Sequence, residues 1–263
     1  MELSVYQSGK TTPTETAHCE IHGIDYQKSD LFFRGKFEGA CPECIRVADE
    51  KLRSAMETRK SEEKLKKLED HRKARIASSG LPKRFVDRTL ANYLVNSPKQ
   101  REALEMTTEY VNNIDALRSG RSLVMSGTVG VGKTHLAAAI VNSVIKIENN
   151  TCAIYVTARD MIRCVRGTWG MRDGSEISVI ERYATTPMLV IDEIGVQYGT
   201  DSEMISMFEI IDKRYGNQLP TVFISNLPLK EMTALLGDRI IDRLREDGSV
   251  ILNMNWPSYR GAA

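Results

Sequence analysis

The sequence predicts an α/β protein built around a parallel sheet, and three short segments support this prediction. Residues 123–125 form an apolar run that is followed by a glycine-rich turn and a helical pattern. Residues 188–191 form a second apolar run, which ends in two acids, and residues 221–225 form a third, which ends in an amide. Continuous apolar strands are typical of parallel sheets that are buried on both faces, and polar residues at their carboxyl ends favour a ligand site there.

The glycine-rich turn has the pattern Gly-x-x-x-x-Gly-Lys-Thr. Its members are Gly127, Thr128, Val129, Gly130, Val131, Gly132, Lys133 and Thr134. The glycines let successive N–H groups turn inward around phosphate oxygens at a helix N-terminus. We expect Lys133 to reach the β- and γ-phosphates of a nucleotide and Thr134 to place its hydroxyl on Mg²⁺. A chance glycine-rich turn is the alternative, and the strand and helix on either side argue against it.

The polar residues after the other two apolar runs suit phosphate chemistry. Asp192 is expected to hold Mg²⁺, and Glu193 to act as the base or water-positioning group for attack on the γ-phosphate. Asn226 could orient the attacking water. The alternative for the two acids is a solvated pair at the end of a strand.

Two arginines lie four residues apart in the predicted helix that follows. Arg239 and Arg243 share one face of this helix. An arginine at the edge of one subunit can stabilise charge on the phosphate of a neighbour's site, as a subunit-coupled ring or filament requires. A solvated basic face is the alternative.

The N-terminal quarter carries two pairs of metal-ligating residues. Cys19 and His22 form a C-x₂-H pair, and Cys41 and Cys44 form a C-x₂-C pair eighteen residues later. This spacing suits a tetrahedral Zn²⁺ with all four positions filled by protein, and such a closed site is structural. His18 could replace His22, although its adjacency to Cys19 makes joint ligation awkward. The remaining alternative is a set of reduced cysteines without metal.

A charged stretch separates this module from the α/β core. Residues 45–78 hold eleven Lys and Arg against seven Asp and Glu, with no Gly or Pro, which favours a continuous helix with only a broken apolar stripe. We therefore predict a zinc module over residues 1–45, a linker helix over 46–79 and the α/β domain over 80–263. The linker is either a solvated spacer or a docking helix for a partner.

A basic segment with an aromatic residue is a candidate for contact with single-stranded DNA. Its members are Arg163, Arg166, Trp169 and Arg172. Basic side chains can follow phosphates while an aromatic ring stacks on a base. The alternative is a core tryptophan beside a solvated basic face.

Composition adds little to the choice of function. The net charge is +1, so nucleic-acid binding would need a local basic surface. Cys152 and Cys164 are expected to be buried or unreactive thiols. With no signal peptide and no long apolar segment, we expect a cytoplasmic protein with no membrane contact.

Over residues 80–263 the chain resembles the AAA+ ATPases of the DnaC/IstB group, beginning with the segment Gly80 to Phe85. By this resemblance residues 127–134 are Walker A, Asp192 and Glu193 are Walker B, and Asn226 is sensor I. Arg243 matches the arginine finger, and Arg260 matches the sensor II arginine. Only thirty-seven residues follow Asn226, too few for a separate helical lid. We therefore expect slow hydrolysis by the isolated chain and a site that a neighbouring subunit completes.

The resemblance implies an ATP-dependent replicative helicase loader, acting with the hexameric helicase and single-stranded DNA and assembling with copies of itself. The N-terminal zinc module would grip the helicase. Two alternatives remain open: a transposition ATPase of the IstB kind that acts on duplex DNA, and a nucleotide-gated adaptor that hardly hydrolyses ATP.

Overall fold

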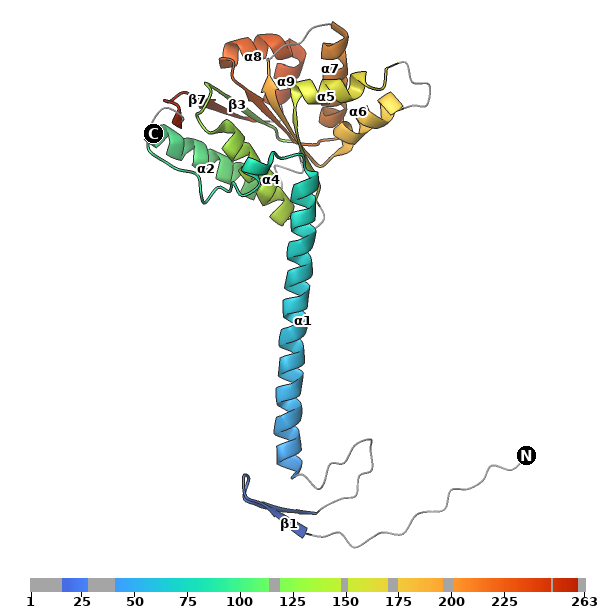
Figure 1. Cartoon of the computed structure of the whole chain (residues 1–263). Helices are drawn as coiled ribbons and strands as arrows, with labels where there is room; N and C mark the ends of the chain where they lie inside the picture. Colours follow the sequence, from blue (N-terminus) through green and yellow to red (C-terminus); the bar gives the residue numbers. More distant parts are fainter. Residues whose placement is uncertain are drawn as a thin grey trace, which may run out of the picture. The chain divides into compact units, whose positions relative to one another are not determined.

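The computed structural model describes residues 16–27, 41–113, 119–147, 151–169, 175–195, 201–246 and 248–259. The chain divides into two compact units, Met1–Lys67 and Leu68–Ala263. Figure 1 labels their α-helices and some of their strands. In the described parts of the chain, no helix has the length and apolar character needed to cross a membrane.

The first unit holds a small antiparallel hairpin. Its strands are β1 (Thr16–Cys19) and β2 (Ile24–Gln27), with Cys19 paired to Ile24 across the turn. Gly23 has a φ of 63° in this turn, and its N–H donates to the carbonyl of Cys19 at 2.7 Å. A two-stranded hairpin of this length is at most marginally stable in water without further support.

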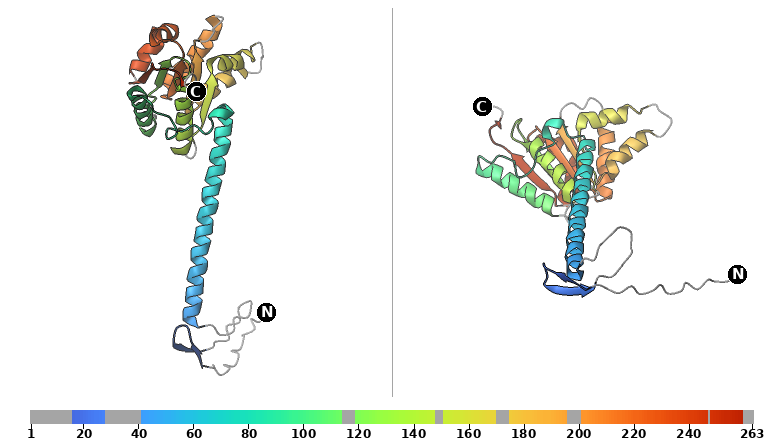
Figure 2. Two further views of the ribbon diagram at one scale, coloured as in Figure 1. Left: turned by 60° about the vertical axis from the view of Figure 1, so that its left-hand side comes forward. Right: turned by 60° about the horizontal axis from the view of Figure 1, so that its bottom comes forward.

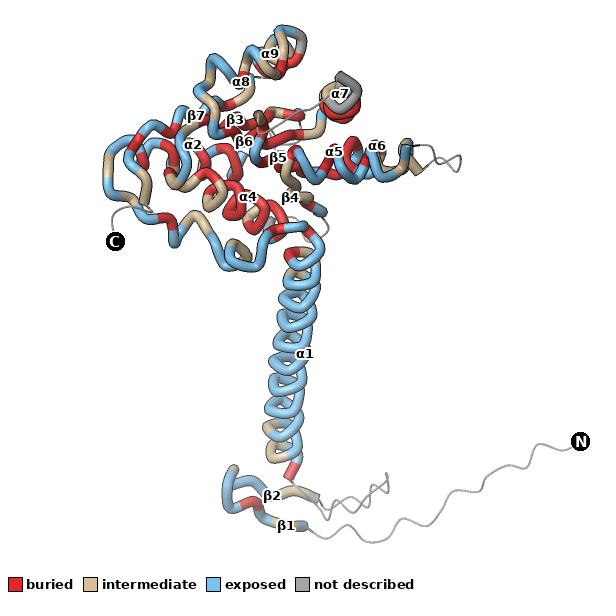
Figure 3. Tube along the Cα trace, turned by 45° about the horizontal axis from the view of Figure 1, so that its top comes forward, coloured by how far each residue is buried: buried red, intermediate tan, exposed pale blue. Residues whose placement is uncertain are grey.

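A helix is present over the predicted linker as α1 (Pro42–Ser78), and it begins four residues before the predicted start at residue 46. Residues 48–71 are all exposed, as Figure 3 shows by colour, including the apolar side chains of Leu52 and Leu65. Gly80, with a φ of 83°, follows the end of the helix, and a Cβ there would lie 2.4 Å from the carbonyl oxygen of Tyr155. Glycine is therefore needed at this close approach.

The second unit is built on one parallel sheet of five strands, in the spatial order β4-β5-β6-β3-β7. The strands are β3 (Leu123–Gly127), β4 (Ala153–Thr157), β5 (Met188–Ile194), β6 (Thr221–Ser225) and β7 (Val250–Met254). The prediction placed the two acids after the second apolar run, but β5 continues through them. They nevertheless lie at the carboxyl edge of the sheet, as predicted.

Helices cover both faces of the sheet, as the views in Figure 2 show. They are α2 (Pro98–Asn112), α4 (Lys133–Ile147), α5 (Ala158–Arg166), α6 (Ser175–Thr185), α7 (Asp201–Gly216), α8 (Leu229–Leu236) and α9 (Asp238–Glu246), with a short 3₁₀ helix η1 at Lys83–Phe85. Neighbouring residues of β3 point to opposite faces. Met125 belongs to the apolar cluster that includes residues of α2 and α4, whereas Val124 belongs to the cluster that includes residues of α5, α6, α7, α8 and α9.

After β6 the described residues form α8, α9 and the edge strand β7. Because β7 pairs with β3, the end of the chain returns to the strand that precedes the glycine-rich turn.

Candidate functional site

The glycine-rich turn connects the end of β3 to the start of α4. Gly130 and Gly132 have φ values of 87° and 99°, which other residues adopt only with strain. A Cβ on Gly132 would lie 2.9 Å from Cε2 of Tyr93. The turn therefore needs glycine at position 132 both for its backbone conformation and for the close approach of Tyr93.

Lys133, the first residue of α4, is only 6% exposed. Its Nζ donates hydrogen bonds to the carbonyl oxygens of Gly127 at 2.6 Å and Thr128 at 2.7 Å. The ammonium group is thus held against the turn at the helix N-terminus, where positive charge and backbone N–H groups favour an anion.

Asp192 is a buried carboxylate at the carboxyl edge of β5, and both of its oxygens accept hydrogen bonds. Oδ1 accepts from the backbone N–H of Glu193 at 2.7 Å, and Oδ2 accepts from the hydroxyl of Thr134 at 3.2 Å. The hydroxyl of Tyr155 on β4 also donates to Oδ2. Burial, with the nearby carboxylate, raises the pKa of Tyr155 far above its usual range, so this hydroxyl stays a donor.

The pair of Thr134 and Asp192 fits a magnesium site. A hydroxyl oxygen and a carboxylate oxygen are hard donors, and they come from two elements whose side chains meet in this structure. The sequence predicted this pair, but it did not indicate the third partner, Tyr155.

Glu193 differs from Asp192 in both conformation and exposure. Its side chain is exposed, and its φ is 60°, an uncommon value for a residue other than glycine. The register between β5 and β6 shifts between Ile191 and Ile194, so the pairing is irregular where Glu193 lies. Asn226 directly follows β6 and lines the same cavity as Glu193.

This cavity has a volume of about 350 Å³, within the range of small-molecule sites. Its lining consists of Arg84, Phe85, Arg88, Asn92, Tyr93, Leu94, Val129, Gly130, Gly132, Lys133, Thr134, His135, Asp192, Glu193, Asn226 and Tyr259. The structure thus brings the turn, both acids and the amide together, as predicted. The residues between 84 and 94, together with His135 and Tyr259, extend the site beyond the predicted set.

Residues from two segments that are distant in the sequence form hydrogen bonds with backbone carbonyl groups of the glycine-rich turn, which we also call the phosphate loop. The carbonyl of Val131 accepts hydrogen bonds from the Tyr93 hydroxyl at 3.3 Å and from Nε1 of Trp256 at 3.0 Å. The carbonyl of Gly130 accepts from the backbone N–H of Tyr259 at 3.1 Å. No sequence motif marks these contacts, which join residues more than thirty positions apart.

His135 connects α4 to the segment that precedes α2, through contacts with Thr89, Asn92 and Tyr93. Its Nε2 lies 3.0 Å from both the carbonyl oxygen of Thr89 and Oδ1 of Asn92, and its ring meets Tyr93 edge-on with centroids 5.1 Å apart. Burial lowers the pKa of His135, which favours the neutral ring at pH 7. With a neutral ring, His135 therefore has a structural role, which is to hold residues 89–93 against α4.

The predicted arginine finger is paired within its own chain. Arg243 on α9 forms an ion pair with Asp212 of α7, and its guanidinium lies 4.8 Å from the ring centroid of Tyr215. The side chain of Arg239 and the whole of Arg260 lie outside the described residues. The structure therefore locates Arg243 at the α7–α9 contact, and the roles of all three arginines stay predictions.

The candidate DNA-contacting residues lie on and just after α5. Arg166 lies over the ring of Trp169 at 5.6 Å, and Trp169 is 40% exposed, so the alternative of a core tryptophan is wrong. Arg163 is exposed and pairs with Asp160 at 3.2 Å. Arg172 lies outside the described residues.

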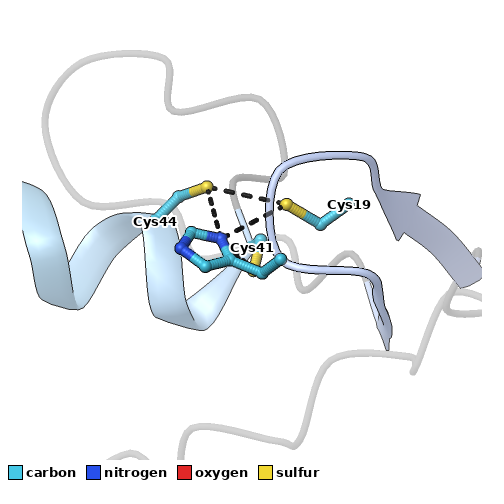
Figure 4. A group of neighbouring side chains, drawn as sticks. Cys19, Cys41 and Cys44 are labelled. Atoms are coloured by element: carbon cyan, nitrogen blue, oxygen red, sulfur yellow. Dashed lines mark hydrogen bonds between the residues drawn. The ribbon is translucent and has the colours of Figure 1, made fainter.

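The four predicted zinc ligands come together in the first unit (Figure 4). Nδ1 of His22 lies 3.5 Å from Sγ of Cys19, 3.8 Å from Sγ of Cys41 and 3.4 Å from Sγ of Cys44. The sulfurs of Cys19 and Cys44 are 3.7 Å apart. Zinc–ligand bonds are about 2.3 Å to sulfur and 2.0 Å to nitrogen. In a tetrahedral site they place two sulfurs roughly 3.8 Å apart, and a sulfur and a nitrogen roughly 3.6 Å apart. The donor set and its spacing therefore fit Zn²⁺.

His18 takes no part in this cluster. Its Nδ1 lies 2.5 Å from the carboxylate of Asp25 on the paired strand, so the alternative ligand set that used His18 is not the one assembled here. Within the cluster, a hydrogen bond with His22 lowers the pKa of Cys19 to about 6, whereas burial raises the pKa of Cys44 to about 11.

The other two cysteines differ from expectation in part. Cys152 and Cys164 are exposed, because Cys152 precedes β4 and Cys164 lies on the outer side of α5. The first part of the prediction, that these thiols are buried, is wrong, and the second part, that they are unreactive, stays a prediction.

Comparisons with known proteins agree with this geometry. Residues 43–262 match the family described as IstB-like ATP binding protein. The replicative helicase loader DnaC of Escherichia coli K12 is 35% identical over 169 residues, which are 64% of this chain and 67% of that protein. The DnaC of Buchnera aphidicola subsp. Baizongia pistaciae is 31% identical over 186 residues, or 70% of this chain and 74% of that protein.

The fold agrees as well. A crystal structure of the DnaC helicase loader matches with a TM-score of 0.58 and 24% identity, covering 65% of this chain and 99% of that one. The predicted AAA+ core and the predicted resemblance are thereby confirmed. The phosphate loop and its facing acids, together with a family match across most of the sequence, place the chain among the IstB-like ATP-binding proteins.

Proposed function

We propose that the protein is an ATP-dependent loader of a replicative DNA helicase. One observation carries this proposal: Lys133, Thr134, Asp192, Glu193 and Asn226 line a single cavity. Relatives that are 35% and 31% identical to this chain are named replicative helicase loaders. ATP binding and hydrolysis would then drive the assembly and release of the loader on the helicase.

The cavity suggests a role for each residue in ATP hydrolysis. Lys133 binds the β- and γ-phosphates, supported by the N–H groups of the phosphate loop. Thr134 and Asp192 hold Mg²⁺, which would supply positive charge at the transferring phosphate. Glu193 orients the attacking water and accepts its proton, because its exposed carboxylate lines the cavity beside the buried Asp192. Asn226 at the end of β6 orients the same water.

Self-assembly completes the site in this proposal. Arg243 would leave Asp212 and act on the nucleotide of a neighbouring subunit, which makes hydrolysis depend on assembly. Arg260 follows Tyr259, a cavity residue, and is proposed to contact the phosphates of its own subunit. The isolated chain should therefore hydrolyse ATP slowly.

Single-stranded DNA is proposed to bind at α5 and the segment after it. The exposed face of Trp169 offers a stacking surface, and Arg163, Arg166 and Arg172 offer charge to the phosphates. Arg166 already lies over the indole ring, so charge and aromatic surface occur side by side.

The N-terminal part is proposed to bind the helicase. Zinc would hold residues 1–45 as a small module, since the described hairpin is too short to be stable alone. Residues 46–79 would be the linker helix and residues 80–263 the ATPase domain. The exposed surface of α1 leaves the linker available to a partner.

A second function has one observation in its favour. The family that matches residues 43–262 is named after IstB, so a transposition ATPase that acts on duplex DNA is the alternative proposal.

The deciding experiment mixes the full-length protein with candidate replicative helicases, with and without ATP, and measures complex mass and helicase loading onto single-stranded DNA. An ATP-dependent complex that loads the helicase is the expected result. ATP-dependent assembly on duplex DNA without a helicase complex would favour the transposition ATPase. ATP binding with slow turnover that DNA does not change would favour the adaptor.

A further inference from the structure

Tyr155 places a polar group inside the core, next to the proposed magnesium ligand. Its side chain is 6% exposed and packs in the apolar cluster on the α4 face of the sheet. On the paired strands Tyr155 lies opposite Val190, and Thr157 lies opposite Asp192. Tyr155 therefore reaches two residues along the sheet to Asp192, a diagonal that a long aromatic side chain can span.

Three donors from three different parts of the fold hold the Asp192 carboxylate. Tyr155 on β4 and Thr134 on α4 both donate to Oδ2, and the backbone N–H of Glu193 donates to Oδ1. Thr134 is itself a proposed magnesium ligand, and the N–H of Glu193 belongs to the irregular end of β5. Tyr155 is a buried residue of a strand that pairs regularly with β5, so its hydroxyl has a fixed position from which to orient the carboxylate.

A purely space-filling role does not account for the hydroxyl. A phenylalanine would fill the same volume without bringing a polar atom into the core, and burying a hydroxyl is unfavourable unless it forms a hydrogen bond. Here that hydrogen bond goes to Asp192. Replacing a residue that forms a hydrogen bond with a metal ligand typically lowers metal affinity or activity 10- to 100-fold.

We propose that Tyr155 is a positioning residue for magnesium-dependent nucleotide binding: its hydroxyl holds Asp192 in the orientation in which the carboxylate and Thr134 take the metal together. This inference rests on the proposed ATPase function. It adds a residue that the Walker motifs do not contain.

The test replaces Tyr155 by phenylalanine, which removes one oxygen and keeps the ring. Binding of a fluorescent, non-hydrolysable ATP analogue is titrated with MgCl₂ and, separately, measured in EDTA. The expected result for Tyr155→Phe is that about tenfold more Mg²⁺ is needed for half-maximal binding, while the affinity in EDTA stays that of the wild type. Tyr110→Phe is the matched control, because Tyr110 is also buried and donates its hydroxyl to the carbonyl of Arg121 at 3.0 Å.

A wild-type Mg²⁺ requirement in Tyr155→Phe would overturn the proposal, as would an equal shift in Tyr110→Phe. If wild-type binding itself ignores Mg²⁺, the proposed nucleotide chemistry fails, and the two failures are thus distinguishable. A second variant combines Tyr155→Phe with Asp192→Asn, which removes the buried charge and so protects the fold if the single variant does not fold. The double variant should match Asp192→Asn in its Mg²⁺ dependence, and any additional loss would show that Tyr155 acts elsewhere.

Discussion

Replacing Cys41 by serine should release zinc from the N-terminal module and leave the nucleotide site intact. Structural zinc sites in small peptides bind with roughly 10–16 kcal/mol at pH 7. Divided equally over the four donors of the cluster, this free energy is about 2.5–4 kcal/mol per donor. Loss of one thiolate should therefore weaken zinc binding by roughly 100- to 1,000-fold.

The assay is metal content per chain after dialysis against a chelator, together with hydrogen exchange of the β1–β2 hairpin. Wild-type protein should retain one zinc and protect the hairpin, whereas Cys41→Ser should lose both. Cys152→Ser and Cys164→Ser are matched controls, because both thiols are exposed and lie outside the cluster.

Histidine variants sharpen this test. His22→Ala should behave like Cys41→Ser, and His18→Ala should keep its zinc because His18 pairs with Asp25. Zinc retained in full by Cys41→Ser, or absent from the wild-type protein, would refute the four-ligand site.

Three further predictions concern the nucleotide site. Lys133→Ala should abolish ATP binding, measured by equilibrium titration, since it removes the buried ammonium at the phosphate loop; unchanged affinity would remove the central assignment. Glu193→Gln should keep ATP affinity but slow single-turnover hydrolysis by about 10²–10⁴-fold, and a normal rate would mean that another group positions the water. Arg243→Ala should leave ATP binding by the monomer unchanged and lower assembly-dependent turnover by roughly 10³-fold, with the exposed Arg245→Ala as control; equal loss of both properties would make Arg243 structural.

How far the sequence predicts the site depends on how local each part is. The phosphate loop is eight contiguous residues whose glycines and lysine specify both backbone and charge, and Asp192 directly follows an apolar run, so these parts are visible in the sequence. The zinc ligands are visible for the same reason, because their pairs have fixed spacing.

The remaining parts depend on packing that local pattern does not encode. Tyr155 contacts Asp192 only because β4 lies beside β5. The sequence of a single strand does not determine which strand lies next to it in the sheet. Arg243 lies against Asp212 because α9 packs on α7, a contact that joins positions thirty-one residues apart. The family resemblance predicts that Arg243 acts at a neighbouring subunit, and it does not indicate the partner that packing gives this arginine within its own chain.

The contacts made by Trp256, Tyr93 and Tyr259 have a consequence on the opposite side of the phosphate loop. A trans peptide unit carries its C=O and the following N–H on opposite sides. When outside donors hold the carbonyls of Gly130 and Val131, the next N–H groups are turned away from those donors. These contacts thereby fix the direction of the backbone N–H groups of Val131 and Gly132, which belong to the glycine-rich turn that is proposed to bind phosphate.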